Sequence, residues 1–324
     1  MRIRYKWISV ILLAIILILA SVLFLQNQAA SSSIVPKEGL LSPRVYTGLL
    51  PEKSYLIVNF KPLKQELNQY IADNNLTVGI YVENFRNGAY MGINERKDFY
   101  PASLSKLPLA IGIMQKVEDG KLSLDTLVNV SKDVTGNNGF GKPYLLSSHQ
   151  FSIRELLEKL LIESDNTAIY LLLPFLSIAD AQGLLDYYGI NIIVNDPVYQ
   201  NGMSPKSLSI VFSSLYFSTV LEAKNSEYLL SLMKNTLFDI KTIAGIPSEV
   251  QVIHKFGVNY FQGNNNFHDC GIMYIEESRI FYCVMTEGMP EKEAVYHTGV
   301  MVSKIYEYIV ETRAKLDELQ GFHI

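Results

Sequence analysis

The sequence predicts an α+β domain in which an antiparallel sheet, flanked by terminal helices, packs beside an inserted all-α subdomain. Alternating apolar and polar residues near both ends of the chain predict strands, and helical spacing dominates the middle. A final helix is expected from about residue 292 to 319, after the last strand. Strands at both ends that bracket a helical middle are the order expected when a terminal sheet packs beside a helical insertion.

A helix and a hairpin are predicted to open the folded part of the chain. The helix is predicted by apolar residues at helical spacing, namely Leu63, Leu67, Tyr70 and Ile71. Residues 76–83 and 89–93 then predict two strands joined by the turn Arg86-Asn87-Gly88.

Helix starts are marked at three places in the middle of the chain. Pro101 stands where a proline is tolerated in a first turn, and a buried helix is expected to follow it. Ser152 and Glu155 have the spacing of a capping box before a leucine-rich helix. Another helix is predicted to begin after Ser204-Pro205.

The C-terminal third is predicted to return to strands. In residues 250–257 the side chains alternate between two faces, so Lys255 and Gly257 share one face. A hairpin from Phe267 to Thr286 follows.

This hairpin carries both cysteines of the chain, Cys270 and Cys283. A turn at Glu276-Glu277 would place them opposite each other, whereas a turn one residue later pairs Cys270 with Met285. Both a disulfide and two buried free thiols stay open, with the free thiols preferred. The five histidines show no ligand spacing to one another or to the cysteines, so no metal site is predicted.

Length and composition indicate a globular protein that does not bind nucleic acid. The chain has 324 residues, of which 48% are hydrophobic and 19% charged, enough for one large domain or a domain with a subdomain. The net charge is −4, and no basic stripe interleaved with aromatic residues occurs.

The N-terminus has the pattern of a membrane anchor. Residues 7–25 are apolar apart from two serines, basic residues precede them, and the next charge is Lys37. We expect a single-pass protein of the cytoplasmic membrane with its folded domain outside the cytoplasm. The alternative is a cleaved signal peptide, with small residues at Ala29-Ala30. The expected organisation is a cytoplasmic tail at 1–6, an anchor at 7–25, a linker at 26–54 and a folded domain at 55–324, with its helical subdomain at about 103–245.

Ser103 and Lys106 suggest nucleophilic chemistry. A serine and a lysine three residues apart at a helix start share one face, so the amine can reach the hydroxyl and activate it. The motif alone is weak, and Ser231-Leu-Met-Lys234 is a second copy, which we interpret as an ordinary helix interior. Taken alone, Ser164-Asp165-Asn166 is typical of a helix cap.

In order and spacing, S-x-x-K at Ser103, Ser164-Asp165-Asn166 and Lys255-Phe256-Gly257 resemble the boxes of class A β-lactamases and penicillin-binding proteins, over roughly residues 61–318. This resemblance implies a β-lactamase/transpeptidase-like fold and acyl transfer without a cofactor. Ser103 would be the nucleophile, Lys106 its base, Ser164 a proton relay and Lys255 a clamp for a substrate carboxylate. Asn166, Phe256 and Gly257 would bind substrate, and the N–H groups of Ser103 and Val258 would form the oxyanion hole.

Two departures from the family pattern bear on activity. Phe256 stands where the family has threonine or serine, which removes a hydroxyl that would bind the substrate carboxylate. The glutamate that activates the deacylating water in class A enzymes has no full match, and Asp196 in Asp196-Pro197-Val198-Tyr199-Gln200 is the nearest candidate, although a plain Asp-Pro turn is preferred.

The predicted function is hydrolysis of a β-lactam ring or a related amide by a membrane-anchored serine hydrolase. One alternative is a D-Ala-D-Ala carboxypeptidase or transpeptidase acting on peptidoglycan stem peptides, favoured by the missing glutamate. Another is a catalytically weak or inactive wall-binding protein, favoured by Phe256. The sequence leaves open the substrate, the oligomeric state and the cleavage of the N-terminal segment.

Overall fold

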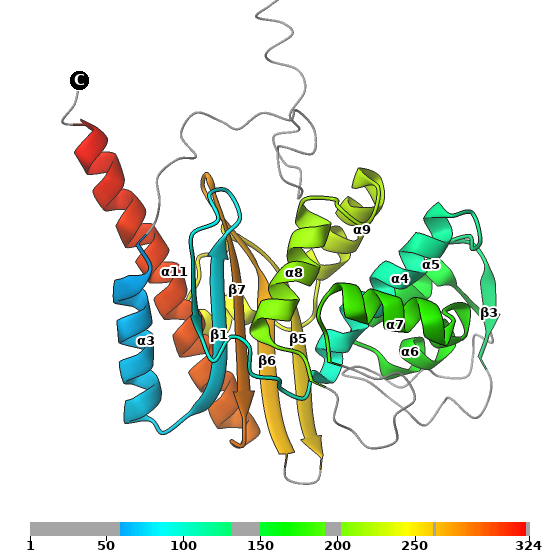
Figure 1. The fold of residues 1–324 in the computed structure, drawn as a ribbon, viewed down its shortest axis with the longest axis horizontal. Coiled ribbons are helices and arrows are strands. Elements are labelled where there is room, and N and C mark those ends of the chain that lie inside the picture. Colours follow the sequence, from blue (N-terminus) through cyan, green and yellow to red (C-terminus); the bar gives the residue numbers. More distant parts are fainter. Residues whose placement is uncertain (1–58, 131–149, 192–201, 262–263, 322–324) are drawn as a thin grey trace, which may run out of the picture.

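A computed structural model describes residues 59–130, 150–191, 202–261 and 264–321. Its centre is an antiparallel sheet of five strands in the order β2-β1-β7-β6-β5 (Figure 1). The strands are β1 (Thr77–Asn84), β2 (Tyr90–Ile93), β5 (Gln251–Phe261), β6 (Asn264–Ile275) and β7 (Ser278–Glu287). The predicted fold class is confirmed, since N-terminal and C-terminal strands form one sheet and β5 is its edge beside the helical part.

The register of the β6–β7 hairpin determines whether Cys270 and Cys283 can form a disulfide. Ile275 pairs with Ser278, so the turn residues are Glu276 and Glu277 and Cys270 lies opposite Cys283. The two cysteines form a disulfide, with their Cα atoms 3.9 Å apart. The preference for free thiols was therefore wrong, and the physical reason is the turn position on which the pairing depends.

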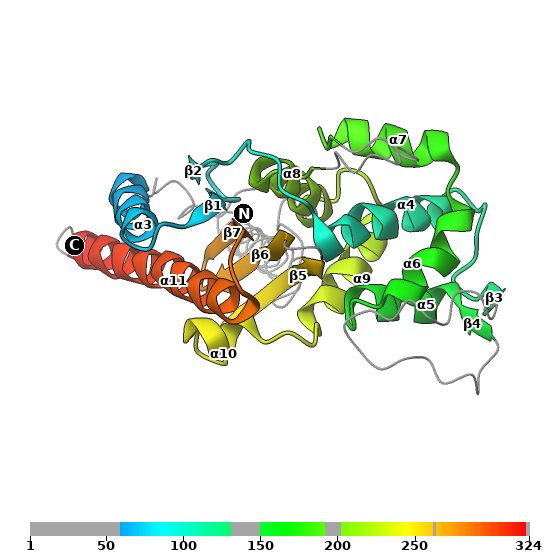
Figure 2. The same ribbon diagram turned by 90° about the horizontal axis from the view of Figure 1, so that it is seen from below.

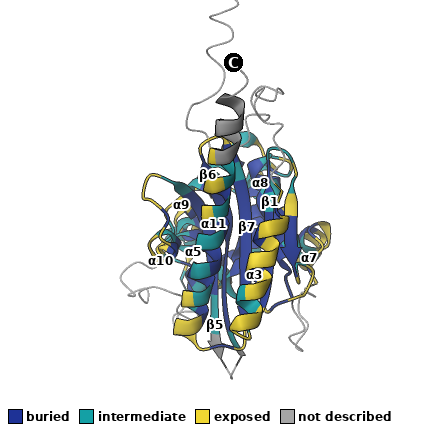
Figure 3. Cartoon of the chain, turned by 90° about the vertical axis from the view of Figure 1, so that its left-hand side faces the viewer, coloured by how far each residue is buried: buried dark blue, intermediate teal, exposed yellow. Residues whose placement is uncertain are grey.

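Helices α3 (Lys61–Asp73) and α11 (Glu291–Gly321) cover one face of the sheet, together with the short helix α10 (Ile240–Ala244). Figure 3 shows that α3 is largely exposed on its outward face, whereas α11 is mostly buried or intermediate along its middle. Leu63 and Leu67 of α3 and Ile305 of α11 are fully buried in this layer. The predicted terminal helices are confirmed by these elements.

The other face of the sheet carries the helical part of the chain (Figure 2). Most of these helices lie to one side of the sheet, away from α3 and α11. Their bounds are η2 (Ala102–Ser105), α4 (Lys106–Glu118), α5 (Ile153–Leu161), α6 (Asn166–Leu172), η4 (Leu173–Phe175), α7 (Ile178–Tyr187), α8 (Pro205–Tyr216) and α9 (Ala223–Lys234), with a small sheet of β3 (Leu127–Asn129) and β4 (Gln150–Ser152).

Local sequence signals set the starts of these helices. The Ser152 hydroxyl accepts from the N–H of Glu155, whose carboxylate accepts from the N–H of Ser152, so the predicted capping box begins α5. Ser204 and Ser207 form a similar box at the start of α8, where Pro205 occupies the first turn. These caps fix where the connecting loops leave the helices.

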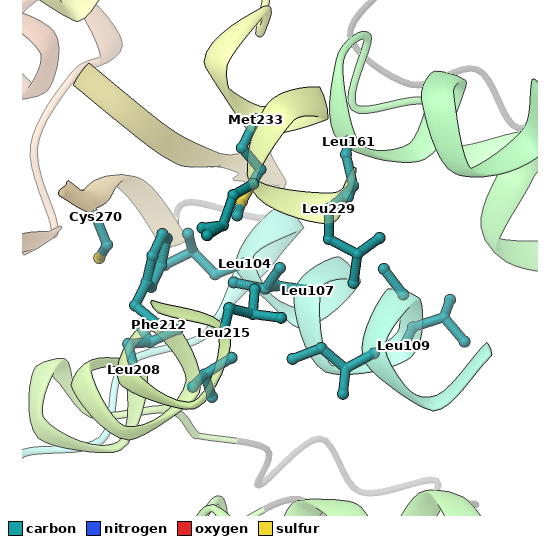
Figure 4. Close-up of a cluster of buried hydrophobic side chains, with 14 of the residues drawn as sticks. Leu104, Leu107, Leu109, Leu161, Leu208, Phe212, Leu215, Leu229, Met233 and Cys270 are labelled. Atoms are coloured by element: carbon teal, nitrogen blue, oxygen red, sulfur yellow. The ribbon is translucent and has the colours of Figure 1, made fainter. Parts of the chain in front are cut away.

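The core of the helical part lies directly behind the turn that carries Ser103. Figure 4 shows Leu104 and Leu107 among side chains from α8 and α9, with Cys270 of the sheet nearby. Leu107, Phe212 and Met233 are at most 1% exposed. The start of α4 is therefore anchored in the core, and its polar groups are held against the edge of the sheet.

The segments predicted as cytoplasmic tail, anchor and linker, residues 1–54, lie outside the described residues. Within residues 59–130, 150–191, 202–261 and 264–321, no single helix is long and apolar enough to cross a membrane. One pair bent by 108°, Asn166–Phe175 with Ile178–Tyr187, passes by length and composition only.

Candidate active site

Ser103 lies in the short helix η2, just before α4 begins. Ala102, the residue before it, has a φ of 48°, a left-handed conformation that is unusual for a residue with a side chain. The N–H of Leu104 donates to the carbonyl of Pro101 at 3.0 Å and closes the turn. The hydroxyl of Ser103 is thereby presented at the N-terminal end of a helix, where backbone N–H groups favour developing negative charge.

Lys106 opens α4 and is only 1% exposed. Its Nζ lies 3.0 Å from the Oγ of Ser103 and 2.8 Å from the Oδ1 of Asn166, and it also donates to the carbonyl of Ser164. Burial lowers the pKa of Lys106 to about 7, although the charge of Asp165 opposes that shift. A lysine with this pKa can hold a free amine near neutral pH, as a general base requires.

Ser164 occupies the turn between α5 and α6 with a φ of 56°. Its Oγ lies 3.2 Å from the Nζ of Lys106 and 2.8 Å from the Nζ of Lys255. The hydroxyl thus bridges two amines that come from different elements. A side chain in this position can pass a proton from one amine to a group that approaches Ser103.

Asp165 caps α6. Its carboxylate accepts from the N–H of Thr167 at 2.6 Å and of Ala168 at 3.2 Å, and it is 1% exposed. Burial raises the pKa of Asp165, while these two N–H donors act in the opposite direction. Ser164-Asp165-Asn166 is therefore a helix cap and also a polar cluster, because the cap places Ser164 and Asn166 on either side of Lys106.

Lys255 on β5 is fully buried. Besides Ser164, its Nζ donates to the carbonyl of Phe256 at 3.0 Å. Burial holds the pKa of Lys255 well below its ordinary value, the charge of Lys106 lowers it further, and Asp269 opposes the shift. Lys106 and Lys255 thus share one hydroxyl in a place that disfavours two positive charges at once.

Gly257 lies where β5 meets the turn that carries Ser103. A Cβ on Gly257 would come within 3.1 Å of the carbonyl oxygen of Pro101 and 3.3 Å of the Cβ of Ala102. Only glycine lets the strand approach this closely without a shift of the turn. Val258 follows on the same strand, so its backbone lies beside the Ser103 turn while its side chain packs against a separate hydrophobic cluster.

The side chain of Phe256 packs in a hydrophobic cluster that borders this polar cluster. It is 1% exposed and packs with Phe267, Met289 and Ala294. The ring of Phe238 lies 5.0 Å away, centroid to centroid. Phe256 was predicted to bind substrate, and it contacts the cluster through its backbone carbonyl and through its ring, whose centroid lies 4.5 Å from the Nζ of Lys255.

The structure therefore brings together five of the predicted side chains: Ser103, Lys106, Ser164, Asn166 and Lys255. Gly257 lies beside them, facing the turn that carries Ser103. Asp196 lies outside the described residues. The second S-x-x-K copy is a helix interior, since the Ser231 hydroxyl donates to the carbonyl of Tyr228 at 2.7 Å. In the part of the chain that the structure describes, no group of three or more His, Cys, Asp or Glu side chains could hold a metal ion.

The sequence interpretation missed His268, which touches the segment that enters the Ser103 turn. Its Nε2 lies 2.8 Å from the carbonyl oxygen of Tyr100, and the side chain is fully buried. A lone histidine in a strand pattern gives no signal for such a contact, because its partner is 168 positions away in the sequence.

Comparison with known proteins places most of the folded part in one family. A family model described as the beta-lactamase enzyme family matches residues 62–309. The chain is similar to the extended-spectrum beta-lactamase PER-1 of Pseudomonas aeruginosa, with 25% identity over 237 residues, 67% of this chain and 76% of that protein. It is also 21% identical to beta-lactamase VEB-1 of the same species over 246 residues, 68% of this chain and 80% of that protein.

Solved structures share the fold. A beta-lactamase from Chitinophaga pinensis superposes with a TM-score of 0.68 at 22% identity, over 78% of this chain and 100% of that one. A PBP-A variant, solved as an acyl-enzyme complex with penicillin G, superposes with a TM-score of 0.66 at 21% identity, over 76% of this chain and 96% of that one. At these identities the likeness concerns the fold alone.

Proposed function

Because the chain belongs to the beta-lactamase enzyme family, we propose that it is a membrane-anchored serine hydrolase that opens a β-lactam ring, or a related amide, by acyl transfer through Ser103. One observation carries this proposal. The Nζ of Lys106, whose pKa burial lowers to about 7, lies 3.0 Å from the Oγ of Ser103. A free amine at that distance can take the hydroxyl proton as the oxygen attacks a carbonyl.

The acylation step follows from the contacts of Lys106. Its Nζ has four oxygen neighbours, on Ser103, Ser164 (two) and Asn166, which is more than three ammonium hydrogens can serve. In the free amine, two hydrogens and one lone pair remain. The lone pair can accept the Ser103 hydroxyl hydrogen while Asn166 and the Ser164 carbonyl keep the amine in place. The C–O bond then forms and the carbonyl oxygen becomes an oxyanion.

Collapse of this intermediate needs a proton on the leaving nitrogen. Ser164 bridges Lys106 and Lys255, so its hydroxyl can donate to the nitrogen and be reprotonated by the Lys106 ammonium, which carries the proton taken from Ser103. The oxyanion would be held by the N–H groups of Ser103 and Val258, at the junction of the Ser103 turn with β5. The C–N bond breaks, an acyl-enzyme on Ser103 remains, and water releases it.

For substrate binding, we assign the amide of Asn166 to the acyl side of the substrate and Lys255 to its carboxylate. The polar contribution of a hydroxyl at position 256 is absent, because the residue is a phenylalanine packed into a hydrophobic cluster. Compared with a site that has threonine or serine at this position, carboxylate-bearing ligands should therefore bind more weakly by about 1.5 to 3 kcal/mol, the value of one hydrogen bond to a charge.

The membrane anchor is part of the same proposal. It rests on residues 7–25 and the basic residues before them, which favour an N-terminus in the cytoplasm. The catalytic domain would then work on the outer side of the cytoplasmic membrane, where β-lactams and peptidoglycan stem peptides are met.

A second candidate is a D-Ala-D-Ala carboxypeptidase or transpeptidase. It is favoured by the lack of a full match to the class A glutamate and by the fold likeness to PBP-A, a protein solved with penicillin G as an acyl-enzyme. Both candidates use the same acylation chemistry. They differ in how fast water releases the acyl group.

The test is the intact mass of the full-length protein, in mild detergent, during incubation with a fluorescent penicillin. We expect an adduct on the wild type and none on Ser103→Ala. Decay of the adduct within minutes supports the β-lactamase, and a long-lived adduct together with release of D-alanine from a stem peptide supports the carboxypeptidase. No adduct and no D-alanine release would overturn both and favour a wall-binding protein that has lost activity.

A further inference from the structure

The segment that leads into the Ser103 turn has no regular structure of its own to hold it. On one side, the N–H and carbonyl of Phe99 exchange hydrogen bonds of 3.0 Å with Met203. Farther along, Ala102 has a left-handed φ of 48°. A residue with a side chain keeps such a conformation only where its surroundings impose it. The contacts around Tyr100 and Pro101 therefore matter for where Ser103 lies.

His268 supplies one of these contacts from the sheet. Its Nε2 lies 2.8 Å from the carbonyl oxygen of Tyr100, three residues before Ser103. On the other side of the ring, the N–H of Thr286 donates to Nδ1 at 3.2 Å. A backbone N–H can only donate, so Nδ1 must be the acceptor, and the ring hydrogen resides on Nε2, from which it donates to Tyr100.

Burial keeps this ring neutral. His268 is fully buried, and burial lowers the pKa of His268 to about 4, although the carbonyls of Tyr100 and Phe267 and the charge of Glu287 oppose that shift. A proton on Nδ1 would also face the N–H of Thr286. The single tautomer is therefore set by two contacts and by burial, and it persists across the neutral range.

The sheet holds the turn at two adjacent points. His268 pairs with Gly257 in the β5–β6 register. His268 binds the carbonyl of Tyr100, and Gly257 faces Pro101 and Ala102 so closely that an added Cβ would lie 3.1 Å from the carbonyl oxygen of Pro101. Together they fix the backbone from Tyr100 to Ala102 relative to the strand that also carries Lys255.

We propose that His268 is a positioning residue for the nucleophile, and that its neutral Nε2–H tautomer holds the backbone before Ser103 at the distance that acylation requires. It does not touch substrate. It acts through Tyr100, and its loss should lower the rate of acylation more than it changes substrate affinity, since displacement of a reacting group by about 1 Å can cost about 100-fold in rate.

Two isosteric variants separate the two contacts of the ring. In His268→Gln, the amide nitrogen occupies the place of Nε2 and can still donate to Tyr100. In His268→Asn, the shorter amide can accept from Thr286 but does not reach Tyr100. His297→Asn is the control, because His297 also makes a ring-nitrogen contact, to the hydroxyl of Tyr70, far from the site.

The first measurement is the acylation rate of each full-length variant by a fluorescent penicillin over a range of concentrations, which separates affinity from rate. This readout rests on the proposed function. We expect His268→Asn to lose about tenfold or more in rate at nearly unchanged affinity, with His268→Gln and His297→Asn within about threefold of the wild type. Equal losses of acylation rate in His268→Gln and His268→Asn, or no loss in either variant, would overturn the proposal.

The second measurement does not depend on any substrate. In full-length protein with ¹⁵N-labelled histidine, NMR reports the tautomer of His268, and ¹³C labels on the lysine ε-carbons report the titration of Lys106. We expect Nε2–H at pH 7 and a shifted Lys106 titration in His268→Asn but not in His268→Gln. An Nδ1–H or charged ring at pH 7, or an unchanged Lys106 titration in both, contradicts the proposal even if penicillin never acylates the protein.

Discussion

Lys255 donates a hydrogen bond of 2.8 Å to the Oγ of Ser164, and this contact joins the edge of the sheet to the turn between α5 and α6. Because Lys106 reaches the same hydroxyl from α4 at 3.2 Å, two buried amines share one oxygen. Each charge lowers the tendency of the other amine to keep its proton. The arrangement therefore favours a state with at least one free amine, which is the form that can activate Ser103.

Replacement of Ser164 by alanine should remove this shared partner while leaving Lys106 close to Ser103. We expect Ser164→Ala to acylate about 10² to 10⁴ times more slowly, the usual contribution of a positioned proton-transfer group. The measurement is the rate of adduct formation with a fluorescent penicillin, followed by intact mass.

Ser231→Ala is the matched control for this loss. Ser231 belongs to the second S-x-x-K copy, but its hydroxyl is bonded within α9 to the carbonyl of Tyr228. Acylation by this variant should equal that of the wild type. A loss in Ser231→Ala as large as in Ser164→Ala would mean that the relay has been assigned to the wrong serine.

The pKa of Lys106, about 7, predicts how acylation depends on pH. The free amine is the reactive form, so the acylation rate should rise with pH through about 7 and level off above it. Lys106→Arg should remove this rise together with most of the activity, because a guanidinium does not lose its proton in this range. A rate that falls between pH 6 and 8 in the wild type would contradict the role of Lys106 as base.

The same shift has a consequence for stability. Since the pKa of Lys106 is lower in the folded protein than its ordinary 10.5, the unfolded chain binds more protons between about pH 7 and 10.5. The contribution of Lys106 to the free energy of unfolding is therefore least favourable below pH 7 and improves as pH rises through this window. Urea unfolding of wild type and Lys106→Met at pH 7 and pH 9 measures the difference.

Elements with a local signal were predictable from the sequence. The capping box of Ser152 and Glu155, the first-turn proline Pro205 and the alternation around Lys255 all depend on residues close together in the chain. The proximity of the three boxes could be predicted because their order matches that of a family with one fold. Boundaries of these elements followed from the same local physics.

The pairing of the cysteines could not be predicted, and the turn shows why. Glu276 adopts a φ of 45°, a conformation for which glycine or asparagine would have been the expected signal. Two glutamates give no such signal, so the register remained ambiguous by one residue. The contact of His268 with Tyr100 was hidden for another reason, because only the assembled sheet brings them together.

Gly257 should be intolerant of a side chain because of what it faces. A Cβ there would lie 3.1 Å from the carbonyl oxygen of Pro101, a backbone atom that cannot move without the Ser103 turn. We expect Gly257→Ala to lower the acylation rate by about tenfold or more, since small displacements of a nucleophile are costly. Gly183→Ala in α7 is the control, because nothing lies within 4 Å of its added Cβ and alanine favours the helix. Unchanged acylation by Gly257→Ala would show that the turn can shift freely.

Tyr282 and Tyr188 test how much a buried hydroxyl contributes to the free energy of unfolding when its hydrogen-bond partner is a carboxylate or a hydroxyl. The hydroxyl of Tyr282 donates to the carboxylate of Asp269, which also receives a contact of 2.8 Å from Nδ1 of His254, and Tyr282 and Asp269 are fully buried. Tyr188, also fully buried, lies 2.9 Å from the hydroxyl of Ser214. Removal of the first contact leaves a buried carboxylate with one donor fewer, whereas removal of the second affects only a neutral group.

We therefore expect Tyr282→Phe to lower the free energy of unfolding by about 1.5 to 3 kcal/mol and Tyr188→Phe by about 0.5 to 1.5 kcal/mol. Urea unfolding at pH 7, with the same slope required for both variants and the wild type, measures the two losses. Because the two tyrosines are equally buried, the difference between the two losses reports the difference between their hydrogen-bond partners, Asp269 and Ser214. A larger loss in Tyr188→Phe than in Tyr282→Phe would contradict the stronger contribution of the contact with Asp269.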